Sequence, residues 1–273
     1  MIAGVKPRNT VDRGRMKGAL LVQWDIRRVR ETGSTNEDAV SLLKESDKSV
    51  LVIADKQNAG RGRRGRDFYS PKGTGLYMSL AMHDALTLMK TARVTALAAV
   101  AVSEAIDKVV FDGRNHSLIK WVNDIYVDKK KVCGILSEAM ISMEDGDGGT
   151  VVVGIGINVY EPSEGFPEGI NTKAGYLIGR DDRSRGNIRS DLAAAVMGEF
   201  FRCINAPEES LAIYRKRSCL IGNYVTVNSF VPNDDRSGKR ARVTGIDDEC
   251  RLLIEYEDGI SDALSSGEVS VIL

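Results

Sequence analysis

Short apolar runs alternate with helical periodicities over the first 217 residues of the chain. The short runs predict strands, because a buried strand needs only about four to eight residues. These strands are expected over residues 23–32, 49–55, 75–80, 118–127, 131–139 and 150–159. Longer segments with apolar residues every three or four positions predict helices over residues 35–45, 86–110, 192–203 and 208–217.

A helix-start signal stands at Ser34-Thr35-Asn36-Glu37. In such a capping box the Ser34 hydroxyl accepts a hydrogen bond from the Glu37 backbone N–H, and the Glu37 carboxylate reaches back to the start of the helix. We therefore expect the helix over residues 35–45 to be capped by its own side chains.

The pattern changes at about Cys219 to short alternating strands, expected at residues 224–227, 240–245, 251–256 and 268–272. Asn, Asp and Gly residues supply the turns between them. Such a segment predicts a small β-barrel of SH3-like size. The predicted division is an N-terminal extension of low structural content over 1–23, a main domain over 24–217 and a C-terminal domain over 218–273.

The composition is that of an ordinary folded protein: 42% of the 273 residues are hydrophobic and 28% are charged. Collagen-like, disordered and disulfide-scaffold classes are excluded. The 38 basic and 38 acidic residues cancel, so no global field draws the chain to DNA or to a membrane. No apolar run reaches 18 residues, and the basic N-terminus lacks the apolar core of a secretory signal.

The four cysteines stand far apart at positions 133, 203, 219 and 250, with no CxxC pair. This spacing argues against a zinc site or a dense disulfide framework. A reducing cytoplasm is the expected location.

Positive charge is concentrated in Gly60–Arg66, where four arginines and three glycines fill seven positions. Glycine lets the backbone approach a ligand closely, and arginine offers forked donors that match phosphate or carboxylate oxygens. The segment predicts an anion site. Two alternatives are an exposed basic loop and an RNA-contacting RGG-like loop, although RGG segments are usually longer and repeated.

Two further segments carry polar groups in apolar surroundings. Lys120-Trp121-Val122-Asn123-Asp124 reads as a strand end whose alternation places Lys120, Val122 and Asp124 on one face. The alternative is a hairpin edge protected by lysines. Gly154-Ile155-Gly156-Ile157-Asn158 resembles half of a dinucleotide fingerprint, but the third glycine is missing. Its glycines make room for a neighbour, either a structural one or a ligand.

Taken in order, these segments resemble one family, the biotin protein ligases or biotin–[carboxylase] ligases. The resemblance is carried by GSTN at 33–36, KQNAGRGRRGR at 56–66, KWVND at 120–124, KVCGIL at 131–136 and GIGINV at 154–159. It implies an α+β fold, with a mixed sheet flanked by helices as in the class II aminoacyl-tRNA synthetase core and a C-terminal SH3-like β-barrel.

The resemblance also implies a two-step reaction with ATP, biotin and Mg²⁺. The biotin carboxylate attacks the α-phosphate to give biotinyl-5′-AMP, and a lysine of a biotin carboxyl carrier protein then takes the biotin. Two anions must be held together in the first step, a task that suits an Arg/Gly loop and a strand lysine. A loop that closes over the mixed anhydride is expected, because water would hydrolyse it.

By motif position, Lys131, Arg61 and Arg63 resemble catalytic residues of the family. The biotin-binding set implied is Ser34, Thr35, Asn36, Gln57, Arg61, Gly62, Arg63, Lys131, Gly134, Gly154 and Gly156. The nucleotide-binding set implied is Arg63, Arg66, Phe68, Lys120, Asn123 and Asn158. Asp124 either orients a basic side chain or helps to hold Mg²⁺.

The chain departs from the family pattern at two positions: Val122 stands where proline is usual, and Phe68 stands near the usual tryptophan. Only about 23 residues precede the first strand, so we expect no helix-turn-helix repressor domain and no DNA binding. Members of the family often form a homodimer. The rival functions are a lipoate protein ligase and a nucleic-acid-binding module, the latter disfavoured by the many acids in the C-terminal segment.

Overall fold

The computed structural model describes residues 23–83, 91–141, 149–180, 186–228, 236–265 and 268–270. Of these, Ile141 and residues 268–270 are described for their backbone alone. The predicted N-terminal extension therefore lies almost wholly outside the described residues.

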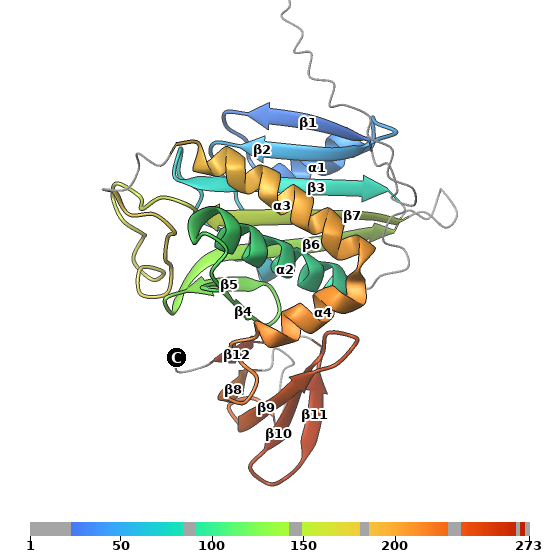
Figure 1. Ribbon diagram of the computed structural model, residues 1–273, viewed down its shortest axis with the longest axis vertical. Coiled ribbons are helices and arrows are strands. Elements are labelled where there is room, and N and C mark those ends of the chain that lie inside the picture. Colours follow the sequence, from blue (N-terminus) through green and yellow to red (C-terminus); the bar gives the residue numbers. More distant parts are fainter. Residues whose placement is uncertain are drawn as a thin grey trace, which may run out of the picture.

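The main body is a seven-stranded mixed sheet with strand order β1-β2-β3-β7-β6-β5-β4 (Figure 1). Its strands are β1 Trp24–Val29, β2 Ser49–Ala54, β3 Gly75–His83, β4 Leu118–Lys120, β5 Asp124–Val127, β6 Lys130–Ile141 and β7 Gly149–Asn158. Only the β1–β2 pair is parallel among these neighbours; the others are antiparallel. This mixed sheet agrees with the predicted fold class.

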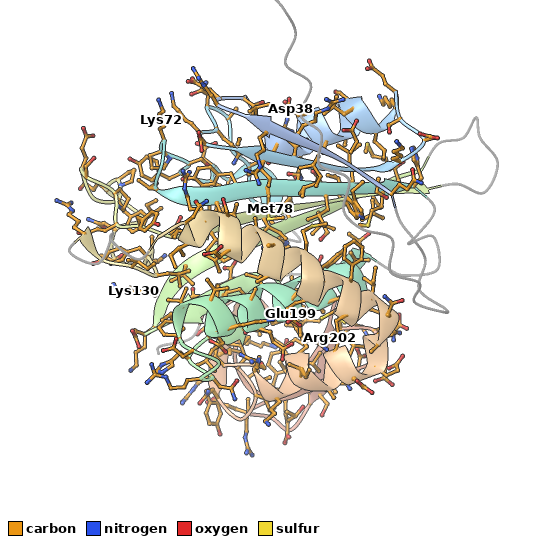
Figure 2. The ribbon with its side chains drawn as sticks, turned by 45° about the horizontal axis from the view of Figure 1, so that its top comes forward. Asp38, Lys72, Met78, Lys130, Glu199 and Arg202 are labelled. Carbon is orange, nitrogen blue, oxygen red and sulfur yellow. The ribbon has the colours of Figure 1, made fainter. Side chains whose placement is uncertain are left out.

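Helices cover both faces of the sheet, but unequally. The long helices α2 Thr91–Val110 and α3 Ile188–Asn205 lie side by side across one face (Figure 1), and α4 Pro207–Lys216 follows them. Buried residues of β3 such as Met78 lie in the core that these helices share (Figure 2). The short helix α1 Thr35–Leu43 packs on the opposite face, against β2 and β3.

Strand alternation in β7 decides where a ligand can lie. Val151, Val153 and Ile157 point into the core beneath α2 and α3. The glycines between Val153 and Ile157, Gly154 and Gly156, face the side of α1, which the described long helices α2 and α3 leave uncovered. Period-two alternation thus turns one strand into a core element on one face and an open floor on the other.

The C-terminal segment forms a five-stranded antiparallel sheet of order β11-β10-β9-β8-β12. Its strands are β8 Tyr224–Asn228, β9 Arg240–Ile246, β10 Leu252–Tyr256, β11 Ser261–Leu264 and β12 Glu268–Ser270. The sequence pattern missed β11, whose four residues alternate only weakly. The sheet agrees with the SH3-like domain expected here, while the division at residue 218 stays a prediction.

Two expectations for the main body are wrong. Residues 118–127 are not one strand: β4 and β5 form a hairpin around a turn at residues 121–123. The Ser34 side chain forms no cap hydrogen bond, and the Glu37 carboxylate pairs with Arg61 instead of reaching back to the start of the helix. The helix predicted from residue 86 is described from Thr91 onward, and residues 84–90 lie outside the described residues.

None of the helices in the described part of the chain combines the length and apolar character needed to span a bilayer.

Candidate functional site

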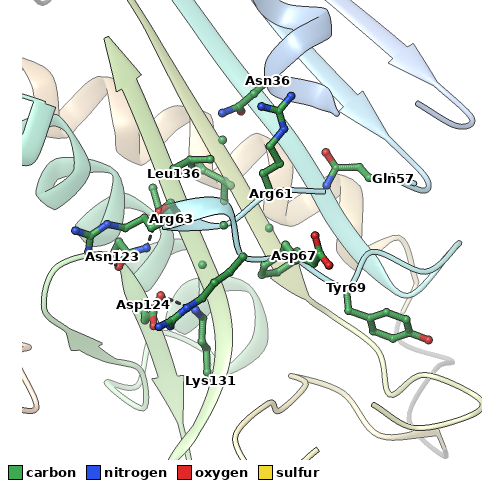
Figure 3. A pocket seen from close by; sticks show the side chains of 18 of the residues that line it. Asn36, Gln57, Arg61, Arg63, Asp67, Tyr69, Asn123, Asp124, Lys131 and Leu136 are labelled. Atoms are coloured by element: carbon green, nitrogen blue, oxygen red, sulfur yellow. Dashed lines mark hydrogen bonds and ion pairs between the residues drawn. The ribbon is translucent and has the colours of Figure 1, made fainter. Parts of the chain in front are cut away.

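A cavity of about 1190 Å³ opens on the face of the sheet that carries α1. Every residue that the sequence predicts for the site lines it. These are Ser34, Thr35, Asn36, Gln57, Arg61, Gly62, Arg63, Arg66, Phe68, Lys120, Asn123, Asp124, Lys131, Gly134, Gly154, Gly156 and Asn158. Figure 3 shows Asn36, Gln57 and Arg61 toward one end and Asn123, Asp124 and Lys131 toward the other. The tertiary structure thus brings together residues as far apart in the chain as Ser34 and Asn158.

A buried polar network surrounds the start of α1. The Thr35 backbone N–H and its hydroxyl both donate to Gln57 Oε1, over 2.9 and 3.0 Å. Gln57 Nε2 in turn donates to Ser70 Oγ at 3.1 Å. The Gln57 carboxamide replaces the missing Ser34 cap, because it satisfies one of the free N–H groups at the helix start.

The network continues through Ser79, which is fully buried in β3. Its hydroxyl lies 2.7 Å from both Thr35 Oγ1 and Asn36 Oδ1 and donates to one of them. Asn36 Nδ2 donates to Glu138 Oε2 at 2.8 Å. Buried amide and hydroxyl groups held this way keep fixed directions, which suits recognition of a neutral polar ligand.

The floor of the cavity is made of glycines because side chains lie directly above them. A Cβ on Gly154 would come within 2.2 Å of Asn36 Oδ1, and one on Gly156 within 2.4 Å of the Phe68 ring. Gly134 pairs with Gly156 across β6 and β7, and its Cβ would also meet Phe68, at 3.3 Å. The three glycines therefore make room for Phe68 and Asn36. Their predicted contact with biotin stays a prediction.

The Arg/Gly segment folds into a tight turn over the cavity. Phe68 N–H donates to Gly60 O at 2.8 Å, and Gly62 N–H donates to Arg66 O at 2.6 Å. The short 3₁₀ helix η1 Arg63–Gly65 closes the turn, with Gly65 at φ +71°, a conformation that glycine adopts at low cost.

The arginines of this turn bridge the two ends of the site. Arg61 forms an ion pair with Glu37 of α1. Arg63 Nη1 donates to Asn123 Oδ1 at 3.4 Å, near the β4–β5 turn (Figure 3). The turn thus connects the polar network at α1 to the strands that carry the lysines.

Lys131 forms an ion pair with Asp124, with 2.7 Å between Nζ and Oδ1. Its side chain is one-third exposed and lines the cavity, while its backbone is held by Lys173 O and the Gly175 N–H, each at 2.8 Å. Burial and the Asp124 charge raise the pKa of the neighbouring Tyr126 to about 12, so this phenol stays neutral. The Asp124 carboxylate holds the Lys131 side chain at the site through this ion pair.

Asp124, the carboxylate named above as a possible Mg²⁺ ligand, is already engaged in an ion pair. Its partner is Lys131, and the described residues contain no cluster of three or more His, Cys, Asp or Glu side chains suited to a metal. Of the two alternatives for Asp124, orientation of a basic side chain is the one that this ion pair favours.

The turn at residues 121–123 corrects the strand expected there. Lys120 and Asp124 pair across the hairpin instead of alternating along one strand. Asn123 donates through Nδ2 to Ile135 O at 2.7 Å, and its own carbonyl accepts from the Ile135 N–H at 3.0 Å. The polar residues of this motif therefore reach the cavity from a turn.

Several residues in and behind the site were not predicted from the sequence. Ser79 was detectable as a lone polar residue within the apolar run of β3. The wall formed by residues 166–174 had no such signal, since it lies in a segment rich in Gly, Pro and charge. In this wall Phe166 packs edge-on against Tyr69, with ring centroids 6.4 Å apart.

Basic side chains dominate the charge of the cavity lining. Arg61, Arg63, Arg64, Arg66, Lys120, Lys129, Lys131 and Lys173 line it, against the acids Glu37, Asp67, Asp124 and Glu138. Such a lining can hold two anionic groups at once, because the cations offset their repulsion. The arrangement suits a neutral polar head group at the α1 end and a phosphate or carboxylate under the arginines.

Two family models match the chain. One, described as the biotin/lipoate A/B protein ligase family, matches residues 26–158. The other, described as the biotin protein ligase C-terminal domain, matches residues 222–271.

Curated relatives agree with these matches. The chain is 35% identical over 226 residues to the bifunctional ligase/repressor BirA of Bacillus spizizenii, covering 80% of this chain and 65% of that protein. The chain therefore spans just under two thirds of the length of that relative. It is 28% identical over 250 residues to the biotin–[acetyl-CoA-carboxylase] ligase of Mycobacterium tuberculosis, covering 90% and 88% of the two chains.

Among solved structures, the biotin protein ligase from Aquifex aeolicus in complex with biotin and ATP matches with a TM-score of 0.69 and 26% identity. The match covers 90% of this chain and 97% of that one.

Proposed function

The chain belongs to the biotin protein ligase family, and from that premise we propose that it is an ATP-dependent enzyme that attaches biotin to a carrier protein. One observation carries the proposal. A single cavity is lined at one end by Thr35 and Gln57, two members of a neutral polar network, and elsewhere by a cationic group that includes Arg63 and Lys131. Biotin has the matching chemistry, a neutral ureido ring at one end and a carboxylate at the other.

In the first step, a biotin carboxylate oxygen attacks the α-phosphorus of ATP and pyrophosphate leaves. The carboxylate is already ionised at neutral pH, so the step needs no general base. It does need cations, because the attacking group and the phosphates repel each other. Arg63 and Lys131 supply them, and Asp124 holds the Lys131 ammonium in place.

In the second step, a neutral lysine amine of a biotin carboxyl carrier domain attacks the carbonyl carbon of biotinyl-5′-AMP. The carbon–oxygen bond to phosphate breaks, AMP leaves, and the new amide loses a proton to solvent. Lys131 and Arg63 stabilise the departing phosphate by the same charges. Most of the rate gain comes from positioning and charge, since the described lining residues include no cysteine or histidine nucleophile.

Magnesium would bind together with the nucleotide phosphates. Mg²⁺ is commonly held by one or two carboxylates together with substrate phosphates. Since Asp124 is paired with Lys131, we assign no protein ligand to the ion and derive no step through it.

Lipoate is the competing substrate, because one of the matching family models covers both ligase types. The match of residues 222–271 to a biotin protein ligase domain favours biotin. The test is to incubate the full chain with ATP, an apo carrier domain and either biotin or lipoate, and to follow carrier mass. Biotin transfer supports the proposal, and lipoate transfer without biotin transfer would overturn it.

A carrier protein as acceptor, a homodimer and a cytoplasmic location stay predictions. Analytical ultracentrifugation with and without biotin tests whether the chain forms a homodimer.

A further inference from the structure

The β4–β5 turn, residues 121–123, controls two contacts of the site. Asn123 in this turn accepts a hydrogen bond from Arg63 and is fastened to Ile135 by two bonds. Asp124, the next residue, holds Lys131. Any displacement of the turn therefore moves Asn123 and Asp124. These are the partners of Arg63 and Lys131, the cations assigned to the reacting groups.

The turn is held by residues far along the chain. The Trp121 indole N–H donates to Cys250 O at 2.8 Å, across 129 positions. The Tyr214 hydroxyl donates to Val122 O at 2.9 Å, across 92 positions. All four residues are buried, so neither bond is exchanged with solvent. Figure 1 shows the reason: β4 and β5 are the strands of the main sheet nearest to the C-terminal sheet.

The acceptor of the Trp121 bond is itself fixed. Cys250 lies in the β9–β10 turn, where its N–H donates to Asp247 O at 3.1 Å. Asp247 Oδ1 accepts from the backbone N–H of Arg251 at 2.8 Å, which closes the turn. Arg215 of α4 donates through Nε to Ile246 O at 2.8 Å and ties the same turn to the main domain. The C-terminal sheet thus presents a rigid carbonyl to Trp121.

We propose that Trp121 is a positioning residue, through which the C-terminal sheet holds Asn123 and Asp124 in register with Arg63 and Lys131. This role rests on the proposed function, because the site it serves is the adenylate-forming one. It assigns the C-terminal sheet a part in the first chemical step, although none of the described residues that line the cavity belongs to that sheet.

The test compares Trp121→Phe with Trp24→Phe in the full chain. Both variants replace a largely buried indole by a smaller ring. Among the described residues the Trp24 indole N–H has no hydrogen-bond partner, so only Trp121→Phe removes a bond. Pyrophosphate exchange with biotin and ATP gives kcat and the two KM values, and calorimetry gives the biotin Kd.

For Trp121→Phe we expect kcat of adenylate formation to fall roughly tenfold, as for loss of one buried hydrogen bond that positions charged groups, with the biotin Kd unchanged. Tyr214→Phe, which frees Val122 O, should show the same pattern more weakly. Trp24→Phe should leave kcat unchanged. In an Asn123→Ala background, the further effect of Trp121→Phe should be smaller than in the wild type, because the route through the Asn123 side chain is already cut while the one through Asp124 remains.

Equal losses in the two tryptophan variants, or a parallel loss of kcat and biotin affinity in Trp121→Phe, would show a merely structural role and refute the proposal. Hydrogen exchange at the Ile135 amide, which bonds Asn123 O, tests it without activity. Exchange should quicken in Trp121→Phe and not in Trp24→Phe, and unchanged exchange refutes the proposal. If the wild type makes no biotinyl-5′-AMP, the proposed function fails, while this exchange experiment still decides the positioning claim.

Discussion

Gly156→Ala is the sharpest packing test of the site. The new methyl group would lie 2.4 Å from a ring carbon of Phe68, whereas ordinary contact starts at about 3.4 Å. Gly156 lies in β7 between β3 and β6, so its backbone has little room to retreat. The Phe68 ring is also confined, with Tyr77 edge-on at 6.5 Å between centroids. The ring must therefore move outward into the cavity.

Overpacking of this kind costs about 1–3 kcal/mol of unfolding free energy. We expect that loss in urea unfolding of Gly156→Ala, together with weaker biotin binding, because the displaced ring narrows the cavity. The matched control is Gly245→Ala in β9, where the added methyl meets only Leu253 at 3.6 Å, an ordinary contact.

The same clash predicts a rescue. Phe68→Leu in the Gly156→Ala background removes the ring and should recover at least half of the lost stability, a coupling that a double-mutant cycle measures. If Gly156→Ala is as stable as the wild type and binds biotin equally well, the close packing of Phe68 on the glycine floor is wrong.

Three further predictions concern charge and ionisation. Lys131→Ala should lower adenylate formation by at least about 100-fold with an unchanged circular dichroism spectrum, since preorganised charge carries the step; near-normal pyrophosphate exchange would remove Lys131 from the catalytic residues. Arg63→Ala should release biotinyl-5′-AMP into solution, which chromatography detects, and undiminished retention would contradict its role. Burial raises the pKa of the Cys219 and Cys250 thiols from 9.0 to about 11. The unfolded thiols ionise first, so unfolding free energy should fall as pH rises above about 9. Replacing both cysteines by alanine should reduce that dependence but not abolish it, because burial also raises the pKa of the Cys133 and Cys203 thiols.

Strands of the main sheet such as β2 and β7 could be predicted from their apolar patterns, because neighbouring elements bury one or both of their faces. β2 has five buried residues among six, and β7 alternates between core and cavity, so periodicity and run length sufficed for both. The site residues were readable for a different reason. The segment Gly60–Arg66 contains only glycine and arginine, so it adds no apolar side chain to the hydrophobic core. Its arginines indicate an anion site whatever the position of the segment in the fold.

The β4–β5 hairpin could not be read in this way. Trp121 and Val122 look like strand residues because they are apolar, and only tertiary structure shows what buries them. Their partners are Cys250 and Tyr214, about a hundred residues away. Local periodicity cannot distinguish a residue that is buried by its own sheet from one that is buried by a distant domain.

By itself the sequence determined most of the strands and helices, though not β11 or the β4–β5 hairpin. It also determined the order of the motifs and the chemical groups available to the site. The tertiary structure decided which partner each group has: Gln57 rather than Ser34 at the start of α1, and Phe68 above Gly156. It also placed Asp124 on Lys131. The physical reason is that hydrogen bonds and ion pairs depend on distances of about 3 Å, which form only when the complete sheet brings its strands together.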